Sequence, residues 1–78
     1  MEGIVKWYDS LNSMGFIVDK EGREYFFKKR DVATVNGVFP GLCCMDKVEF
    51  SPKEKDKLSD QDTAIKITKT EAYNHGKQ

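Results

Sequence analysis

Hydrophobic and polar residues alternate along several short stretches of this chain, which is the periodicity of β-strands and not of helices. Residues with turn propensity, mostly glycine, asparagine, aspartate and proline, separate these stretches. Strands are predicted over Gly3–Tyr8, Met14–Val18, Glu24–Lys29, Lys47–Phe50 and Thr63–Thr68. Five short strands in 78 residues are typical of a small closed or partly open barrel, so we predict an all-β fold.

The segments between these strands read as turns and loops. Residues 19–22 (Asp-Lys-Glu-Gly) predict a compact hairpin loop, and residues 30–41 contain two further turn signals, Asn36-Gly37 and Pro40-Gly41. A single helical turn is compatible with residues 31–34. Pro52 is expected to stop the fourth strand, and the charge-rich residues 53–62 read as a solvated loop. The domain is therefore predicted over residues 1–69, followed by a flexible tail over 70–78.

Alternation also assigns side chains to the two faces of each strand. Along the second strand Met14, Phe16 and Val18 share one face, with Gly15 and Ile17 opposite. Along the third strand Phe26 and Lys28 share a face. The opposite face of that strand is expected to carry Tyr25, Phe27 and Lys29, and in the fifth strand Ala64 is expected opposite Ile65 and Ile67. The residues assigned to the core are Ile17, Phe27, Phe50 and Ile67.

Composition narrows the functional classes. The chain is 38% apolar and 12% aromatic, which is too aromatic for a disordered protein. Thirteen basic residues balance thirteen acidic ones, so no overall field attracts nucleic acid or an anionic membrane. A basic patch, if the protein has one, must be assembled by folding.

Other classes are excluded by what the sequence lacks. No apolar run is long enough to span a membrane, and residues 1–4 do not begin a secretory signal. The adjacent Cys43 and Cys44 are poorly placed for a disulfide with each other, so we expect free thiols and a cytoplasmic protein. The single histidine, His75, lies far from both cysteines, and no catalytic motif is present. We therefore predict no enzymatic activity, no cofactor, no metal and no small-molecule substrate.

Aromatic residues interleaved with lysines are the strongest functional signal. Pairing of the second and third strands would place Phe16 beside Phe26, and the first strand adds Lys6, Trp7 and Tyr8. A sheet face with flat rings and ammonium groups suits single-stranded nucleic acid, because bases stack on rings while lysines contact phosphates. The same rings could instead be core residues, and for Trp7, Phe16 and Phe26 the pattern alone leaves both readings open.

Several of these segments resemble the cold-shock domain, the small oligonucleotide-binding (OB) barrel of bacterial cold-shock proteins and Y-box proteins. Residues 3–8 (Gly-Ile-Val-Lys-Trp-Tyr) resemble its opening strand, and residues 14–17 and 24–28 resemble its two ribonucleoprotein-type motifs. Residues 41–42 with 47–50 are similar to its fourth strand, and residues 64–68 to its closing strand. The resemblance covers residues 3–69 and implies a five-stranded antiparallel OB-fold β-barrel.

The resemblance also implies a function and a site. The family binds single-stranded RNA or DNA with little sequence specificity, commonly as an RNA chaperone or a transcription antiterminator. Carried over by position, base-stacking rings are expected at Trp7, Tyr8, Phe16, Phe26 and Phe39, and Lys6 matches the strand-one lysine of the family. We expect a monomer, although the sequence leaves a dimer open.

Five positions depart from the family pattern. Asn12, Ser13 and Met14 stand where the family has lysine, glycine and phenylalanine, and Lys28 and Lys29 replace a histidine and a phenylalanine. Three stacking groups are thereby lost, while two ammonium groups are gained. The predicted nucleic-acid contacts are Lys6, Trp7, Tyr8, Met14, Phe16, Phe26, Lys28, Lys29 and Phe39.

These departures and the zero net charge keep an alternative open. In that alternative the same barrel is a protein-interaction module, whose altered face binds a polypeptide instead of nucleic acid. Sequence alone does not decide whether RNA or DNA is the ligand.

Overall fold

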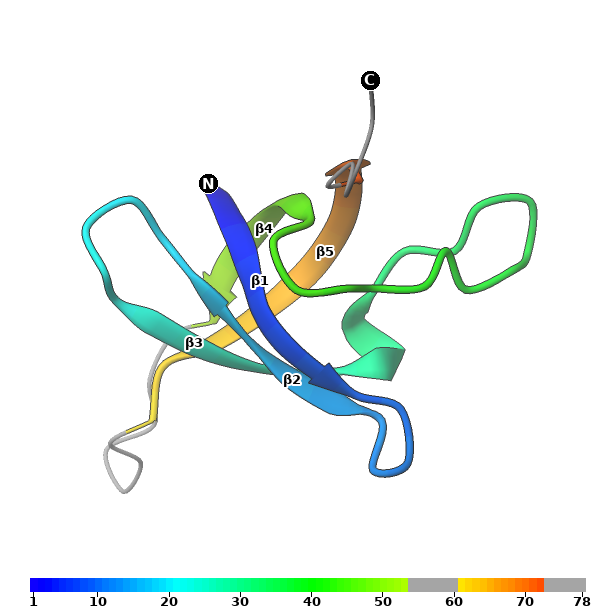
Figure 1. Cartoon of the computed structure of the whole chain (residues 1–78), viewed down its shortest axis with the longest axis horizontal. Helices are drawn as coiled ribbons and strands as arrows, with labels where there is room; N and C mark the ends of the chain where they lie inside the picture. The colour runs from blue at the N-terminus through cyan, green and yellow to red at the C-terminus, as the bar shows by residue number, and fades with distance from the viewer. Residues whose placement is uncertain (54–60, 73–78) are drawn as a thin grey trace.

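The computed structural model describes residues 1–53 and 61–72. The chain forms a small barrel with one 3-10 turn, η1, directly after the third strand (Figure 1). The elements are β1 (Glu2–Asp9), β2 (Met14–Val18), β3 (Glu24–Lys28), η1 (Lys29–Asp31), β4 (Lys47–Lys53) and β5 (Thr63–Glu71). The all-β fold predicted from the alternating pattern is confirmed.

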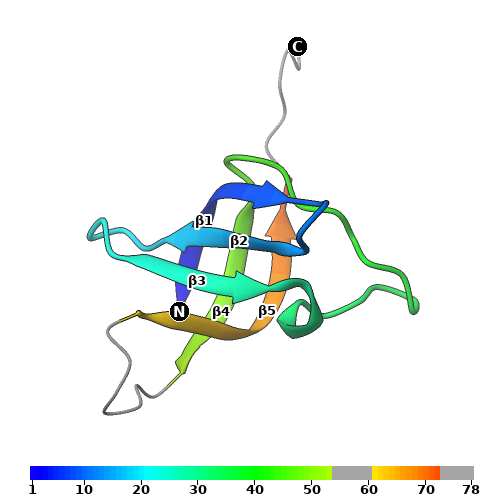
Figure 2. The ribbon, with the colours of Figure 1, turned by 90° about the horizontal axis from the view of Figure 1, so that it is seen from below.

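The strands close in the order β1-β2-β3-β5-β4, and Figure 2 shows β1, β2 and β3 side by side on one wall. The pairs β1–β2, β2–β3, β1–β4 and β4–β5 are antiparallel. The prediction of a wholly antiparallel barrel is wrong at one junction, because β3 and β5 meet in parallel through Phe26 and Thr63. Closure there is reinforced by the Phe26 N–H, which donates to the Asp62 carbonyl at 2.8 Å.

The barrel interior is filled by one apolar cluster. The predicted core residues Ile17, Phe27, Phe50 and Ile67 are all buried, as alternation requires for half of each strand. The ring of Phe50 also packs on Tyr25, with centroids 4.9 Å apart. The remaining buried apolar residues are Val5, Val32, Leu42, Val48 and Ala64.

The prediction for β5 is wrong in one respect, since Ala64 and Ile67 are both fully buried while Ile65 is only partly covered. The cause is an irregular register with β4, in which Glu49 pairs with Thr68 but Ser51 pairs with Ile65. Lys66 takes a left-handed conformation there, with φ of 53°. A bulge of this kind shifts the alternation by one residue, so Ala64 and Ile67 face the same side.

Two predicted boundaries also differ. β4 continues through Pro52 to Lys53, where proline is tolerated close to the end of a strand. β5 continues to Glu71, so Thr70 and Glu71 belong to the barrel and not to the predicted tail. Most of the charged loop predicted over residues 53–62, and the tail from residue 73 onward, lie outside the described residues.

The turns predicted at residues 19–22 and 36–37 are present, whereas no turn forms at Pro40-Gly41, although Gly41 has φ of 76°. Gly22 closes the β2–β3 turn with φ of 87°, and Asn36 and Gly37 form a two-residue turn with φ of 54° and 79°. The neighbouring Val35 and Val38 exchange backbone hydrogen bonds of 2.8 and 3.0 Å. The helical turn expected near residues 31–34 occurs slightly earlier, as η1.

The loop that leads into β4 is fixed by a buried carboxylate. Asp46 is 1% exposed, accepts a hydrogen bond from the Cys43 N–H at 2.8 Å and pairs with the Lys69 ammonium at 3.2 Å. Cys43 and Cys44 are free, as predicted, and the structure shows that both are exposed. Within residues 1–53 and 61–72, no helix has the length and apolar character needed to cross a membrane.

Candidate functional site

The outward face of β1, β2 and β3 is organised in three rows that cross the strands. The register places Trp7, Phe16 and Phe26 in one line, which we call the aromatic row. On one side of it lies the line Asp9, Met14, Lys28, continued by η1, which we call the Lys28 flank. On the other side lies the line Ile4, Val18, Glu24, together with Lys6, which we call the Glu24 flank.

The rings of the aromatic row contact one another. The centroids of Trp7 and Phe16 are 5.3 Å apart, and those of Phe16 and Phe26 are 5.6 Å apart. Both separations lie within the range of favourable aromatic pairs. Trp7 is 39% exposed, whereas Phe16 and Phe26 are partly covered, so the three rings form a continuous surface that solvent can reach.

A β-bulge brings Trp7 into this row. Simple alternation would place Trp7 on the same side as the buried Val5. The register of β1 against β2 instead shifts between Val5 and Trp7, so Lys6 and Trp7 are both exposed in succession. The bulge therefore turns Trp7 outward and Tyr8 inward.

Gly15 allows the strands to approach closely behind the row. A Cβ atom added at Gly15 would lie 2.4 Å from the Trp7 carbonyl oxygen and 2.9 Å from the ring of Phe27. No larger residue fits this space without displacing β1. The glycine between Met14 and Phe16 is thus a requirement of the packing that positions the Trp7 end of the row.

The Lys28 flank contains a shallow pocket of about 300 Å³ beside the last ring of the row. Met14 and Phe26 supply its apolar surface. The polar residues around it are Asn12, Ser13, Lys28, Lys29 and Arg30, and none of the lining residues is acidic. We call this hollow the basic pocket. In the part of the chain that the structure describes, Lys28, Lys29 and Arg30 form no ion pair.

Backbone and side-chain hydrogen bonds fix the walls of the basic pocket. The Lys29 N–H donates to the Ser13 carbonyl at 2.9 Å, which joins the β1–β2 turn to η1. Within that turn, the Asp9 carboxylate accepts hydrogen bonds from the N–H groups of Leu11 and Asn12 and from the Asn12 side-chain amide. The hydrogen bond from the Asn12 side-chain amide is the main cause of the lowered pKa of the Asp9 carboxyl group.

The Glu24 flank has a different charge arrangement. The ammonium group of Lys6 forms an ion pair with the Glu24 carboxylate across β2. Both side chains are about half exposed, so the pair is solvated and weak as a contribution to stability. Its consequence is electrostatic, because the carboxylate neutralises the cation that the resemblance assigns to phosphate.

A second aspartate holds the turn that presents Glu24. The Asp19 carboxylate accepts hydrogen bonds from the N–H groups of Glu21 and Arg23, at 2.9 Å each, and from the Tyr25 hydroxyl at 3.1 Å. These bonds, with that from Arg23 the largest cause, lower the pKa of Asp19. The buried setting of Tyr25 raises the pKa of its hydroxyl.

Tyr8 and Phe39 lie apart from the aromatic row. Both are partly buried and pack against the core, with Tyr8 stacked on Phe27 at 6.0 Å and tilted against Phe39 at 5.5 Å. The Lys29 ammonium lies 4.9 Å from the centre of the Phe39 ring, a cation–π contact. The third strand was predicted to include Lys29, but it ends at Lys28, and η1 begins at Lys29.

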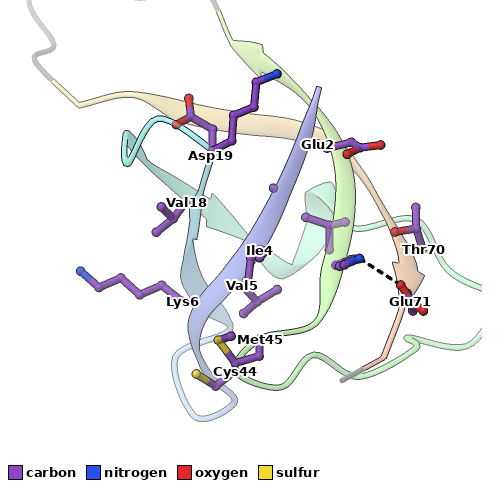
Figure 3. Close-up of a pocket in the computed structure, with 14 residues that line it drawn as sticks. Glu2, Ile4, Val5, Lys6, Val18, Asp19, Cys44, Met45, Thr70 and Glu71 are labelled. Atoms are coloured by element: carbon purple, nitrogen blue, oxygen red, sulfur yellow. Dashed lines mark ion pairs between the residues drawn. The ribbon is translucent and has the colours of Figure 1, made fainter. Parts of the chain in front are cut away.

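A larger hollow of about 680 Å³ lies along the first half of β1 and is drawn in Figure 3. Its apolar lining includes Ile4, Val18 and Met45, and the Lys47–Glu71 ion pair lies at its margin (Figure 3). We call it the side groove. Ile4 is 36% exposed and Met45 is 46% exposed. Within residues 1–53 and 61–72, no group of three potential metal ligands occurs.

Some members of the site escaped sequence reasoning. Arg30 was assigned only to an irregular segment, although the run Lys28-Lys29-Arg30 was a visible signal. Glu24 was not recognised as a partner for Lys6, because the contact depends on the register across β2. The chain matches no protein-family model, and a search of the curated proteins finds no match either.

Proposed function

We propose that this barrel binds single-stranded nucleic acid on the outward face of β1–β3, without enzymatic activity. The observation that carries the proposal is the aromatic row, in which Phe16 contacts both Trp7 and Phe26, with ring centroids 5.3 and 5.6 Å apart. Successive bases stack on such rings, and stacking tolerates any base because each has a flat face. We therefore expect low sequence specificity, because stacking does not read the hydrogen-bonding edges of the bases.

The unpaired cations beside the row support the same proposal. Nucleic-acid backbones carry one negative charge per phosphate, so binding needs positive groups near the stacked bases. Lys28 lies beside Phe26 in the surface of the basic pocket and forms no ion pair with any described residue. We assign phosphate contact to Lys28 and apolar contact to Met14.

The other expected contacts receive smaller roles. Lys6 reaches phosphate only by leaving Glu24, and Lys29 only by leaving Phe39. Tyr8 and Phe39 offer at most an edge to a base, because both pack against the core. The proposed base platform is thus Trp7, Phe16 and Phe26.

We also propose that the chain is a divergent cold-shock domain. Support comes from the closed five-strand barrel and from the positions of its motif residues, since Trp7, Phe16 and Phe26 fall on one face. On this proposal it serves in the cytoplasm as an RNA chaperone or a transcription regulator, as a monomer.

The alternative of a polypeptide-binding barrel is favoured by one observation, the side groove with its exposed Ile4 and Met45. The side groove adjoins the aromatic row along β1, because Ile4 and Val18 belong to both the Glu24 flank and the groove lining. One experiment separates the two functions. Trp7 is the sole tryptophan, so its fluorescence reports on the aromatic row alone.

The experiment is a fluorescence titration with a short oligothymidylate and a short oligouridylate. We expect saturable quenching by both, because a stacked base contacts the indole directly. A matched double-stranded oligonucleotide is the control, and it should quench weakly since its bases are already stacked. Unchanged fluorescence with every single strand would contradict the proposed function.

A further inference from the structure

The basic pocket differs from an ordinary phosphate contact in the number of its cations. Three consecutive basic residues, Lys28, Lys29 and Arg30, line one hollow that contains no lining carboxylate. Elsewhere among the described residues Lys6, Lys47 and Lys69 have a carboxylate partner, whereas Lys20 and Lys66 form no ion pair. The basic pocket is therefore distinguished by the clustering of three basic residues around one hollow without a lining carboxylate.

The acidic residues that lie close in sequence to the pocket-lining residues do not supply a carboxylate to the pocket. Asp31 belongs to η1 but is not among the residues that line the pocket. Asp9 lies on the Lys28 flank, but its carboxylate accepts three hydrogen bonds within the β1–β2 turn. The pocket is thus suited to an anion from outside the chain.

The chemistry of the cations indicates which anion fits best. The guanidinium of Arg30 presents a planar fork that matches two oxygens of a phosphate, and the Lys28 ammonium is a compact charge able to contact a third. A phosphate within a nucleic-acid strand has two free oxygens and one negative charge. A terminal phosphate monoester has three free oxygens and a charge of about −1.5 to −2 at pH 7.

We propose that the basic pocket binds the terminal phosphate of a nucleic-acid strand whose end nucleotide stacks on Phe26. The proposal rests on the proposed function, because Phe26 is both a ring of the aromatic row and a wall of the pocket. Arg30 thereby becomes a residue that determines specificity for strand ends. The protein then prefers phosphorylated ends to otherwise identical strands.

The test compares three six-nucleotide oligothymidylates by Trp7 fluorescence, one with a 5′-phosphate, one with a 3′-phosphate and one with neither. We expect one of the phosphorylated strands to bind about five-fold more tightly than the strand without a terminal phosphate, since exposed ion pairs are individually weak. The two phosphorylated strands show which end enters the pocket.

Variants tie that preference to the pocket. Arg30→Ala and Lys28→Ala should each reduce the affinity ratio between phosphorylated and unphosphorylated strands toward one, and Arg30→Lys should retain part of it because the charge remains. Lys20→Ala is the matched control, since Lys20 lies in the β2–β3 turn and does not line the basic pocket. Circular dichroism verifies the fold of each variant.

The outcomes separate the two proposals. Equal affinity for the three strands, with Trp7 still quenched, overturns the terminal-phosphate site and leaves the proposed function standing. A preference that survives both Arg30→Ala and Lys28→Ala overturns it as well, because the phosphate then binds elsewhere. Failure of all three strands to bind contradicts the proposed function, and the terminal-phosphate site falls with it.

Discussion

The two flanks of the aromatic row present a lysine in opposite states. On the Glu24 flank, Lys6 is neutralised by the carboxylate of Glu24. On the Lys28 flank, Lys28 forms no ion pair within residues 1–53 and 61–72 and shares a pocket with Lys29 and Arg30. The difference comes from the sequence of β3. On the face that carries Phe26, the neighbouring residue is Glu24 on one side and Lys28 on the other.

The flanks are nevertheless built on the same plan. Each ends in a turn held by an aspartate, Asp9 on the Lys28 flank and Asp19 on the Glu24 flank, and each aspartate accepts backbone N–H bonds. Two similarly built turns therefore flank a row that has, among the described residues, an unpaired lysine on one side and an ion-paired lysine on the other. A strand whose bases stack on the row is expected to place its phosphates toward the Lys28 flank, so the row has a charged side and a neutral side.

The largest expected effect follows from removing the ring that both flanks share. Phe16 contacts Trp7 and Phe26, so Phe16→Ala interrupts the row at its centre. Loss of base stacking on one ring costs about 1–3 kcal/mol, which corresponds to a roughly five- to 150-fold weaker affinity for a short oligothymidylate. Fluorescence anisotropy of a labelled oligonucleotide measures this.

Val18→Ala is the matched control for that variant, because Val18 lies on the same face of β2 but outside the aromatic row. Affinity should change little in the control. If Phe16→Ala unfolds the barrel, the ring is part of the core. If it leaves both fold and affinity intact, the row is not the binding surface.

The next effect compares the two lysines directly. Each phosphate neutralised on a single strand contributes about 0.7 to the slope of log affinity against log salt concentration. Lys28→Ala should flatten the slope by roughly that amount, whereas Lys6→Ala should change it less, because Glu24 already neutralises Lys6. Titrations from low to moderate salt provide both slopes. Equal flattening in the two variants would refute the asymmetry between the flanks.

A smaller effect on the salt slope is expected from a substitution that gives the Glu24 flank a positive charge. Glu24→Gln removes the partner of Lys6, so the freed ammonium can contact phosphate and the salt slope should steepen by up to about 0.7. Glu21→Gln is the control, since it removes a carboxylate from the same turn without touching Lys6. An unchanged slope in Glu24→Gln would mean that phosphates do not pass along this flank.

The smallest effect concerns acid stability of the turns. The pKa of Asp19 is lowered from 3.8 in the folded protein, so its carboxylate stabilises the fold above that pH, and this stabilisation is lost as the pH falls through the lowered value. The thermal midpoint should therefore be level between about pH 5 and 7 and decline below about pH 4. Asp19→Asn should lower the midpoint at pH 7 and reduce the acid decline. An identical decline in the variant would assign it to other groups.

Sequence patterning predicted the parts of this structure that depend on local alternation. It placed Phe16 with Met14 on one face and Ile17 on the other, and it assigned Phe27 and Phe50 to the core. It could not predict the bulges near Lys6 and near Lys66, because a bulge depends on the partner strand. The predicted orientation of Ala64, opposite Ile67, was wrong for this reason.

The ion pairing of individual lysines could not be predicted from the sequence either. The pairing of Lys6 with Glu24 joins residues eighteen positions apart, and only the β1–β2–β3 register brings them together. Phe39 was assigned to stacking on bases by resemblance, yet its ring packs on Tyr8 beneath the Lys29 ammonium. Contacts between loops and strands of this kind follow from tertiary packing and leave no local pattern.

The central claim, that a single strand of nucleic acid binds across the aromatic row with its phosphates toward the Lys28 flank, is tested most directly by mapping amide chemical shifts in a ¹⁵N-labelled sample titrated with a short oligothymidylate. We predict the largest shifts at Gly15, Phe16, Phe26, Lys28 and Arg30. We predict small shifts at Ile4, Val18 and Met45, which line the side groove. Large shifts confined to the side groove, or no shifts at all, would contradict the account.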